Sequence, residues 1–297
     1  MHAVTLVNGS HNLGLDALDR GLAYGDGVFE TIALQQGQVQ LWQGHCERLT
    51  KGLLRLGLAA DAAAASVLVT KLISDIQVAY QRFQAPDGVL KITLTRGVGG
   101  RGYAAPQAPQ CTRIVSLAPW PAGRERLSIA GVNSRLCCHP WSVNSALAGL
   151  KHLNRLDQVM ARNEWQDPHI HEGFMLDPEG YIISGVMSSV FLQQQGQLIV
   201  PLLDQCGVAG VMAREVRVIA EQAGINVIQG RINVAALLSA DAVFMTNSLN
   251  GIWPVVNLCP SRSHTKSHAW PISDLTLGLQ KTLAVNLLRQ PLVGELC

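Results

Sequence analysis

A single lysine stands in the stretch 149-GLKHLNRLDQV-159, directly after the small, mostly apolar residues 145–150. This pattern predicts a strand that ends at Lys151 and an amphipathic helix that begins just after it. A lysine at such a junction can be a solvated residue at the start of a helix. It can also be a nucleophile, because a desolvated amine attacks carbonyl carbons. The rest of the sequence has to decide between these two interpretations.

Two other segments have the residue types of an anion site. In 207-GVAGVMARE-215 a loop with two glycines leads into a predicted helix, whose first N–H groups and dipole favour a phosphate. In 246-TNS-248 two hydroxyls and an amide end the apolar strand predicted at 241–245. A helix cap or a turn explains either segment alone. Together with a strand-end lysine they indicate a phosphate-bearing cofactor whose aldehyde Lys151 holds as a Schiff base.

A glycine pattern at 97-GVGGRG-102 matches G-x-G-x-x-G, which is typical of dinucleotide sites. Such a site needs a helix at its end, and Pro106 and Pro109 follow instead, so we expect no nucleotide binding. Two interpretations stay open. The segment is a flexible loop that carries Arg96 and Arg101 beside a pocket for carboxylates, or it is an exposed hairpin tip.

Metal and hydrolase sites are poorly supported. Cys137, Cys138 and His139 are adjacent, and His264 and His268 lie in a polar loop, but neither group has the second cluster of a structural zinc site. A G-x-S-x-G nucleophile motif is absent from the sequence. We therefore expect no bound metal and no hydrolase triad.

The elements that would position these residues follow from periodicity and turn signals. We expect strands at 3–7, 28–34, 39–42, 88–96 and 112–118, with helices at 43–56 and 61–82. Beyond a segment rich in Pro, Gly and charge at 119–126, we expect strands at 127–136, 143–150, 173–177, 181–183, 190–194, 197–201, 225–229 and 241–246. Helices are expected at 153–165, 211–223, 233–239 and 274–289. This order predicts two α/β lobes of α+β type with much antiparallel sheet, divided into domains 1–120 and 121–297.

Composition limits the class of protein. The chain has 297 residues, 48% hydrophobic and 15% charged, which suits a compact enzyme rather than a disordered protein. A net charge of +2 without a dense basic run gives no reason to expect nucleic acid or an anionic membrane as a partner. We find neither a secretory signal nor an uninterrupted membrane span, and seven cysteines without regular spacing favour the cytoplasm.

An ordered set of motifs resembles one known family. The segments are 19-DRGLAYGDGVFET-31, 45-HCERL-49, 95-TRGVGGRGY-103, 149-GLKHLNRLDQV-159 and 207-GVAGVM-212. They are similar to those of the fold-type-IV pyridoxal phosphate (PLP) enzymes, which include branched-chain and D-amino-acid aminotransferases and 4-amino-4-deoxychorismate lyases. The K-H-L-N-R-L form and the R-G-Y loop fit the lyases better than the aminotransferases.

The resemblance implies a role for particular residues. Lys151 matches the catalytic Schiff-base lysine, and Arg48 matches the arginine that binds the PLP phosphate. Further cofactor-binding positions implied in this way are Ser184, Ser188, Ser189, Val211, Met212, Asn247 and Ser248. Tyr24, Thr31, Arg101 and Tyr103 fall where this fold lines its substrate side. The family fold has a smaller N-terminal α/β domain and a larger C-terminal domain rich in antiparallel sheet, with PLP between them, and its members are homodimers.

One segment departs from the family. Where the family reads E-x-x-x-S-N, this chain reads 184-SGVMSS-189, so Ser184 replaces the glutamate that faces the pyridine nitrogen and Ser189 replaces the asparagine. Without a carboxylate the ring is a weaker electron sink.

The implied reaction is the PLP-dependent conversion of 4-amino-4-deoxychorismate to 4-aminobenzoate and pyruvate in folate biosynthesis. Two alternatives remain: an aminotransferase of the same fold that acts on D- or branched-chain amino acids, and a PLP-binding protein with weakened catalysis.

Overall fold

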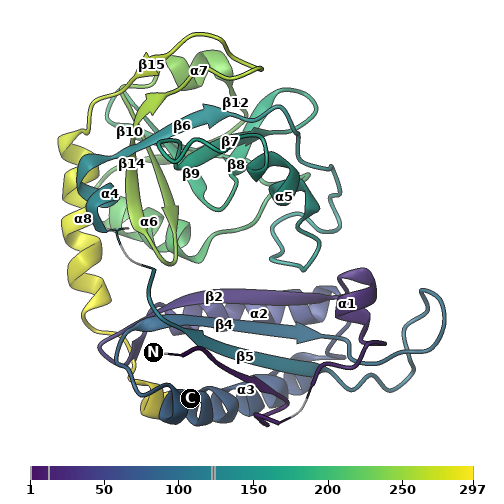
Figure 1. The fold of residues 1–297 in the computed structure, drawn as a ribbon. Coiled ribbons are helices and arrows are strands. Elements are labelled where there is room, and N and C mark those ends of the chain that lie inside the picture. Colours follow the sequence, from purple (N-terminus) through teal and green to yellow (C-terminus); the bar gives the residue numbers. More distant parts are fainter. Residues whose placement is uncertain (1, 13, 122, 124, 297) are drawn as a thin grey trace. The chain divides into compact units, whose positions relative to one another are not determined.

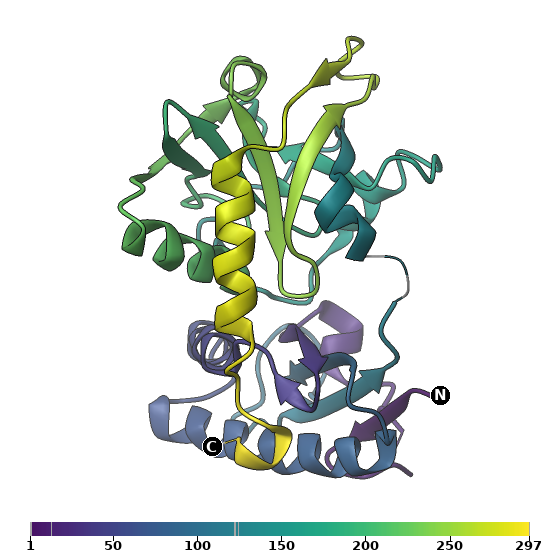
Figure 2. The ribbon, with the colours of Figure 1, turned by 90° about the vertical axis from the view of Figure 1, so that its left-hand side faces the viewer.

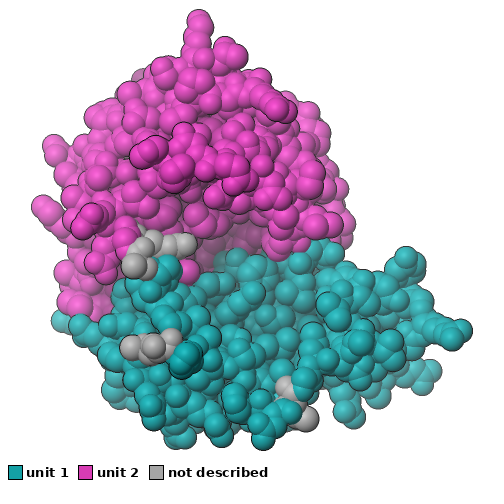
Figure 3. All heavy atoms as spheres, in the orientation of Figure 1, with its two compact units in different colours: residues 1–121, 150–154, 289–297 teal, residues 122–149, 155–288 magenta. Residues whose placement is uncertain are grey.

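The computed structural model describes residues 2–12, 14–121, 123 and 125–296. Within it the chain forms two compact units, coloured separately in Figure 3. Unit 1 comprises Met1–Pro121, Leu150–Asn154 and Arg289–Cys297, and unit 2 comprises Ala122–Gly149 and Arg155–Leu288. The short segment that contains Lys151 thus belongs to unit 1, although the residues on either side of it belong to unit 2.

Unit 1 is built on a five-stranded antiparallel sheet with the order β1-β5-β4-β2-β3. Its strands are β1 (Val4–Val7), β2 (Gly27–Gln35), β3 (Gln38–Val39), β4 (Gly88–Thr95) and β5 (Thr112–Ala118). Helices α2 (Trp42–Arg55) and α3 (Ala62–Phe83) pack on the sheet, α1 (Arg20–Tyr24) precedes β2, and η1 (Val293–Glu295) follows near the C-terminus (Figure 1).

The core of unit 1 follows from alternation along the strands. In β2 the side chains of Val28, Glu30 and Ile32 are buried, whereas Phe29 and Thr31 are only half-buried. Val28 and Ile32 join Leu, Ile and Val side chains of β4, β5, α2 and α3 in one apolar cluster. Because alternate strand residues point to opposite faces, β2 has a helix-covered face and a second face that carries Phe29 and Thr31.

Unit 2 contains a ten-stranded mixed sheet. The order is β11-β10-β9-β13-β14-β6-β7-β8-β12, with β15 paired to β14. The strands are β6 (Val132–Leu136), β7 (Glu172–Leu176), β8 (Tyr181–Gly185), β9 (Ser189–Gln194), β10 (Gln197–Pro201), β11 (Val227–Gly230), β12 (Ile232–Asn233), β13 (Ala242–Asn247), β14 (Gly251–Leu258) and β15 (His268–Ala269). Most pairs are antiparallel, and the parallel ones are β10 with β11, β14 with β6, and β6 with β7.

Five helices accompany this sheet in the described part of unit 2. They are α4 (Glu125–Ala130), α5 (Leu156–Arg162), α6 (Val211–Gln222), α7 (Val234–Leu238) and α8 (Asp274–Leu287). Helix α6 contacts α8 and strand β13, and α8 contacts β14. Figure 2 shows α8, the long yellow helix, facing the viewer. The stacked rings of Phe191 and Phe244, 4.8 Å apart, tie β9 to β13. The expected α+β fold with a larger C-terminal part rich in antiparallel sheet is confirmed.

Four predictions of local structure were wrong. The strand predicted at 39–42 is limited to Gln38–Val39, and α2 begins at Trp42. Residues 143–150 form turns rather than a strand, because Asn144 closes a turn and Gly149, at φ +80°, makes only one bridge, to Val208. Residues 125–130 are helical, so that the strand predicted from 127 begins at 132. The helix predicted at 153–165 spans only Leu156–Arg162, because residues 151–153 instead follow β2 through backbone hydrogen bonds.

The compact units differ from the predicted domains by two short segments. The first change of unit, between Pro121 and Ala122, lies inside the predicted linker 119–126, of which residues 122 and 124 are outside the described residues. Segments 150–154 and 289–297 return to unit 1. The division into domains 1–120 and 121–297 stays a prediction.

One helix of the described chain, α3, is long and apolar enough to cross a membrane. Its side chains Leu72, Ile76, Ala79 and Phe83 are buried in the core cluster of unit 1. A core helix of this kind passes the same test of length and composition.

Candidate functional site

Lys151 lies beside the first residues of β2. Its carbonyl accepts a hydrogen bond of 3.0 Å from Phe29 N, and Leu153 N donates to Gly27 O at 2.9 Å. The Lys151 amine lies 4.2 Å from the centroid of the Phe29 ring. Lys151 is therefore fixed at the half-buried face of β2, where Thr31 follows two residues after Phe29.

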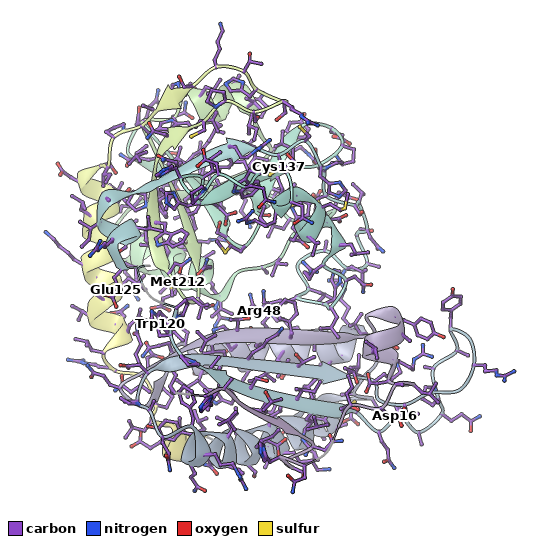
Figure 4. All side chains as sticks on the ribbon, in the orientation of Figure 1. Asp16, Arg48, Trp120, Glu125, Cys137 and Met212 are labelled. Carbon is purple, nitrogen blue, oxygen red and sulfur yellow. The ribbon has the colours of Figure 1, made fainter. Side chains whose placement is uncertain are left out.

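Arg48 lies on α2 (Figure 4) and is held by a buried carboxylate. Arg48 Nε donates to Glu30 Oε1 at 2.8 Å, and Nη2 donates to Oε2 of the same carboxylate. The Glu30 side chain is 1% exposed. This two-point contact fixes the plane of the guanidinium, which is the group that the resemblance assigns to the PLP phosphate.

His45 completes this cluster. Its Nδ1 lies 2.7 Å from Glu30 Oε2. Burial by itself raises the pKa of Glu30, but Arg48 and His45 more than offset it and hold the pKa at about 2. Since Glu30 is ionised, Nδ1 of His45 carries the proton and donates.

The other nitrogen of His45 is an acceptor. Burial lowers the pKa of His45, with Arg48 and Lys151 acting in the same direction against Glu30. The ring is then neutral at pH 7, and Nε2 is buried with no hydrogen-bond partner among the described residues. Sequence reasoning missed Glu30 and His45. The H-x-x-R spacing, which places His45 and Arg48 on one helix face, was the available signal.

The predicted substrate-side residues of unit 1 fall into two places. Thr31 is on β2, two residues after Phe29, whose ring lies beside the Lys151 amine. Tyr24 ends α1, and its ring centroid lies 5.4 Å from that of Tyr103, which is 86% exposed on the loop between β4 and β5. Arg101 is exposed on the same loop.

The loop begins with an arginine that has a structural role. No helix follows residues 97–102, so the glycine pattern is not a dinucleotide motif. Arg96 is buried and donates to Asp26, Leu56 O and Gly57 O. The idea that Arg96 offers its guanidinium to a ligand was wrong, because its donors are used within unit 1.

In unit 2 a buried glutamate organises the turn between β8 and β9. Glu172 Oε1 accepts from Gly173 N and Val186 N at 2.9 Å each, and Oε2 accepts from Met187 N at 3.2 Å and Ser188 Oγ at 2.7 Å. Burial raises the pKa of Glu172, and these four hydrogen bonds oppose the rise. Ser188 thus holds the turn through Glu172, and sequence reasoning did not identify Glu172.

Ser184 precedes this turn and is buried. Its Oγ accepts from Trp141 Nε1 at 3.0 Å and donates to Gly185 O at 2.6 Å. The Arg155 guanidinium lies 5.7 Å from the Trp141 ring centroid, and burial lowers the pKa of Arg155 to about 10. The only proton of the Ser184 hydroxyl is therefore committed to a backbone carbonyl.

An anion-binding arrangement occurs at the N-terminus of α6. Val211 and Met212 are its first two residues, of which Figure 4 labels Met212, and the cap, Gly210, has no side chain to bond their N–H groups. A Cβ on Gly210 would meet Ser189 Oγ at 2.5 Å, so the hydroxyl lies against the helix start.

Strand β13 adds polar groups to the same part of unit 2. Ser189 pairs in register with Thr246, whose Oγ1 is buried and lacks a hydrogen-bond partner within the described chain. Asn247 Oδ1 caps the following turn by accepting from Leu249 N and Asn250 N, which fixes the half-buried Ser248 between them. The structure thus brings Ser189, Val211 and the end of β13 together.

The described residues hold no group of three or more His, Cys, Asp and Glu side chains that could bind a metal ion.

Comparison with known proteins identifies the family. Residues 27–258 match the family described as amino-transferase class IV. The chain belongs to this family.

Two lyases are similar to this class IV chain over nearly its whole length. An aminodeoxychorismate lyase from Vibrio harveyi is 30% identical over 277 residues, which are 93% of this chain and 98% of that protein. The crystal structure of 4-amino-4-deoxychorismate lyase from Pseudomonas aeruginosa matches with a TM-score of 0.86 and 41% identity, and covers 95% of this chain and 99% of that one.

A hypothetical aminotransferase from Mycobacterium tuberculosis in a PLP-bound form shares the fold, with a TM-score of 0.78 and 16% identity over 95% of this chain and 98% of that one. The expected fold-type-IV architecture and the resemblance to the lyase branch are confirmed by these matches.

The residues of the class IV chain suit PLP, the cofactor of fold-type-IV enzymes. Each unit has features that suit a phosphate: the clamped guanidinium of Arg48 in unit 1, and the uncapped helix start beside the unsatisfied Thr246 hydroxyl in unit 2. Lys151 carries an amine, the group that forms a Schiff base with an aldehyde.

Proposed function

We propose that the protein is a PLP-dependent lyase that converts 4-amino-4-deoxychorismate to 4-aminobenzoate and pyruvate. The observation that carries this proposal is the 41% identity to the Pseudomonas aeruginosa lyase over 95% of the chain. The fixed position of the Lys151 amine at the half-buried face of β2 supports it.

We assign the cofactor contacts residue by residue. Lys151 holds the PLP aldehyde carbon, and Arg48, together with the backbone N–H groups of Val211 and Met212, holds the phosphate. Further contacts are assigned to Ser184, Ser188, Ser189, Asn247 and Ser248. When bound, PLP withdraws electrons from the carbon that carries the substrate amino group.

Lys151 also moves the protons in this proposal. With substrate bound, the Lys151 amine would take the proton from the carbon that bears nitrogen. The same amine gives a proton to the enolpyruvyl group, which leaves as pyruvate while the carbocycle becomes aromatic. Thr31, Tyr24, Tyr103 and Arg101 are assigned to the substrate, with Arg101 facing a carboxylate.

Ser184 decides between lyase and aminotransferase. Its hydroxyl accepts from Trp141 and donates to Gly185 O, so it neither carries a negative charge nor has a second proton to offer the cofactor. Aromatisation drives the elimination and tolerates a weak electron sink, whereas transamination has to store the electrons on the cofactor. The same observation is the support for the weaker candidate, a PLP-binding protein with reduced catalysis.

We further propose that the enzyme is a cytoplasmic homodimer. An exposed apolar patch in unit 1 supports a partner copy. It consists of Leu18, Leu22, Tyr24, Val98 and Tyr103. Six cysteines of the described part form no disulfide, which fits a reducing compartment.

A product assay tests the function. Purified protein loaded with PLP should release 4-aminobenzoate and pyruvate in equal amounts from 4-amino-4-deoxychorismate. Borohydride should attach the cofactor covalently to Lys151, and peptide mapping locates the label. Keto acid formed from an amino acid would make the protein an aminotransferase, bound PLP without turnover would make it a carrier, and a label on Lys91 or Lys281 would remove Lys151 from the site.

A further inference from the structure

Arg20 holds the loop that carries two of the proposed substrate residues. Its Nη1 donates to Gly102 O at 3.1 Å and to Ala104 O at 3.2 Å, and Nη2 donates to Tyr103 O at 2.8 Å. One buried guanidinium thus binds three consecutive carbonyls, 82 to 84 residues away in sequence. A fork with five donors can do this, whereas a lysine amine, with its donors on one atom, cannot reach all three.

The guanidinium is itself anchored from its other edge. Arg20 Nε donates to Asp26 Oδ2 at 2.9 Å, and Arg96 binds both oxygens of the same carboxylate at 2.7 and 3.0 Å. Burial raises the pKa of Asp26, but Arg96 and Arg20 outweigh it and lower the pKa below the usual value. Asp26 is therefore ionised at pH 7 and ties Arg20 to the end of β4.

These contacts set the direction of the loop side chains. The carbonyls that Arg20 binds belong to the three residues after Arg101, and Gly102 adopts φ +82°, which favours glycine. Tyr103 then contacts Tyr24, whose ring lies 5.0 Å from the Arg20 guanidinium carbon. The stem of Arg20 also supports the loop, because a Cβ on Gly99 would lie 2.6 Å from Arg20 Cδ.

We propose that Arg20 is a positioning residue that holds residues 101–104 in the conformation that presents Arg101 and Tyr103 to the substrate. Arg20 contacts neither substrate nor cofactor in this proposal. It acts on substrate affinity through the loop, whereas the chemical step at Lys151 is unaffected. The assignment of Arg101 and Tyr103 rests on the proposed function, and the conformation of the loop does not.

The first measurement is tryptic cleavage after Arg101 in the PLP-loaded protein. A protease needs the residues after the cleaved bond in an extended, mobile conformation, and Arg20 pins these residues. Cleavage after Lys266, exposed in a loop of unit 2, is the internal reference. In Arg20→Lys the Arg101/Lys266 cleavage ratio should rise by at least about tenfold, because the population of the open loop grows as its hydrogen bonds are lost.

A matched glycine pair separates the contact from general effects on the loop. Gly99→Ala should raise the same ratio, since its Cβ displaces the Arg20 stem. Gly100→Ala should leave it unchanged, since a Cβ there meets nothing within 4 Å. An unchanged PLP spectrum and melting temperature identify the variants that have folded. If Arg20→Lys does not fold, Gly99→Ala still tests the contact.

The second measurement is lyase kinetics. KM should rise about tenfold in Arg20→Lys while kcat stays within about twofold, the pattern of lost binding that is uniform between ground and transition states. An unchanged cleavage ratio in Arg20→Lys and Gly99→Ala would overturn the proposal, as would a loosened loop with unchanged KM. A wild-type protein without lyase activity would instead overturn the proposed function, and the cleavage ratio would still decide whether Arg20 holds the loop.

Discussion

At the scale of single residues, burying the Glu30 carboxylate costs free energy, and its contacts with Arg48 and His45 offset that cost. A buried carboxylate is stable only when it is paired and hydrogen-bonded, and Glu30 has both an arginine and a histidine. The two-point contact between Glu30 and Arg48 keeps the guanidinium in one plane before any phosphate binds. Preorganised donors of this kind bind an anion without first having to reorient.

Arg48→Lys tests this orientation. Lysine keeps the positive charge opposite Glu30 but loses the two-point contact, so PLP affinity should fall by about tenfold, the equivalent of roughly one charge-assisted hydrogen bond. Titration of the apoprotein with PLP, followed by absorbance, measures the change. Arg55→Lys on the exposed side of the same helix is the control and should bind PLP as the wild type does. Equal affinities for all three proteins would exclude Arg48 from the phosphate site.

Glu30→Gln tests the ionisation. Because the folded-state pKa, about 2, lies below the usual glutamate value of 4.5, the contribution of Glu30 is fully present above pH 4.5. It is lost as the pH falls towards 2. At pH 7 the variant should unfold with a free energy lower by roughly 2–4 kcal/mol, since Arg48 loses its buried partner. The deficit should shrink between pH 4.5 and pH 2.

Urea unfolding of the apoprotein across this pH range measures the deficit. Glu221→Gln, an exposed substitution on α6, should show almost none at any pH. A deficit in Glu30→Gln that does not change with pH would mean that ionisation is not what stabilises the cluster.

At the scale of elements, unit 2 carries its polar groups at strand ends and at one helix start. The turn between β8 and β9 is held by Glu172, which accepts from three backbone N–H groups and from Ser188. An ionised carboxylate can accept all four hydrogen bonds, because neither of its oxygens carries a proton. This arrangement fixes Ser188 and the start of β9, where Ser189 lies against the helix cap.

Glu172→Gln should open this turn. The amide NH₂ would face Met187 N, placing one donor against another, and the loss of unfolding free energy should be roughly 1–3 kcal/mol. Hydrogen exchange of the Val186 and Met187 amides should quicken, which a general loss of stability alone would not confine to this turn. Glu179→Gln, an exposed change in the preceding turn, is the control. Protection at 186 and 187 equal to the wild type would refute the role of Glu172.

Local sequence patterns predicted most of the helices and strands. They failed where contacts between distant segments determine the secondary structure. The helices α2, α3, α6 and α8 were predicted to within a few residues, because their apolar periodicity is long and regular. Strand β14 was missed because Pro254 interrupts it. The strand survives there, since Pro254 pairs only with β13 and the ladder to β6 begins at Val255.

The candidate site was predicted in a similarly uneven way. Motifs with short spacing singled out Lys151, Arg48 and the α6 start, since each depends on residues close in sequence, and their roles stay predictions. The partners Glu30, Glu172 and Trp141 were not identified, because they meet their targets across 15 to 43 positions. The strand expected before Lys151 was wrong, and yet the lysine is fixed, because β2 rather than its own segment supplies the support.

At the scale of the whole molecule, the exposed apolar patch of unit 1 calls for a partner surface. Leu18, just before α1, is 67% exposed, and Leu22, on α1, is 64% exposed. Val98 bridges to the backbone of Asp19 next to them. Tyr103 extends the patch from the adjoining loop. Exposed apolar residues that adjoin in this way mark interaction sites more often than isolated ones do. A second copy of the chain is the partner that the proposed homodimer supplies.

Leu22→Glu tests whether this patch forms the dimer interface. If the dimer interface buries the patch, the substitution places an unpaired carboxylate in an apolar contact. The cost should be on the order of several kcal/mol, the penalty for an unpaired buried charge. The wild type should sediment at about twice its subunit mass of 32.0 kDa, and Leu22→Glu at the mass of one subunit. Analytical ultracentrifugation at micromolar concentration measures both.

Val67→Glu, at a site 54% exposed on α3, places the same charge away from the patch and should leave the dimer intact. A dimeric Leu22→Glu protein, or dissociation by Val67→Glu as well, would show that subunits do not associate through the patch, because the response would then not depend on where the charge is placed.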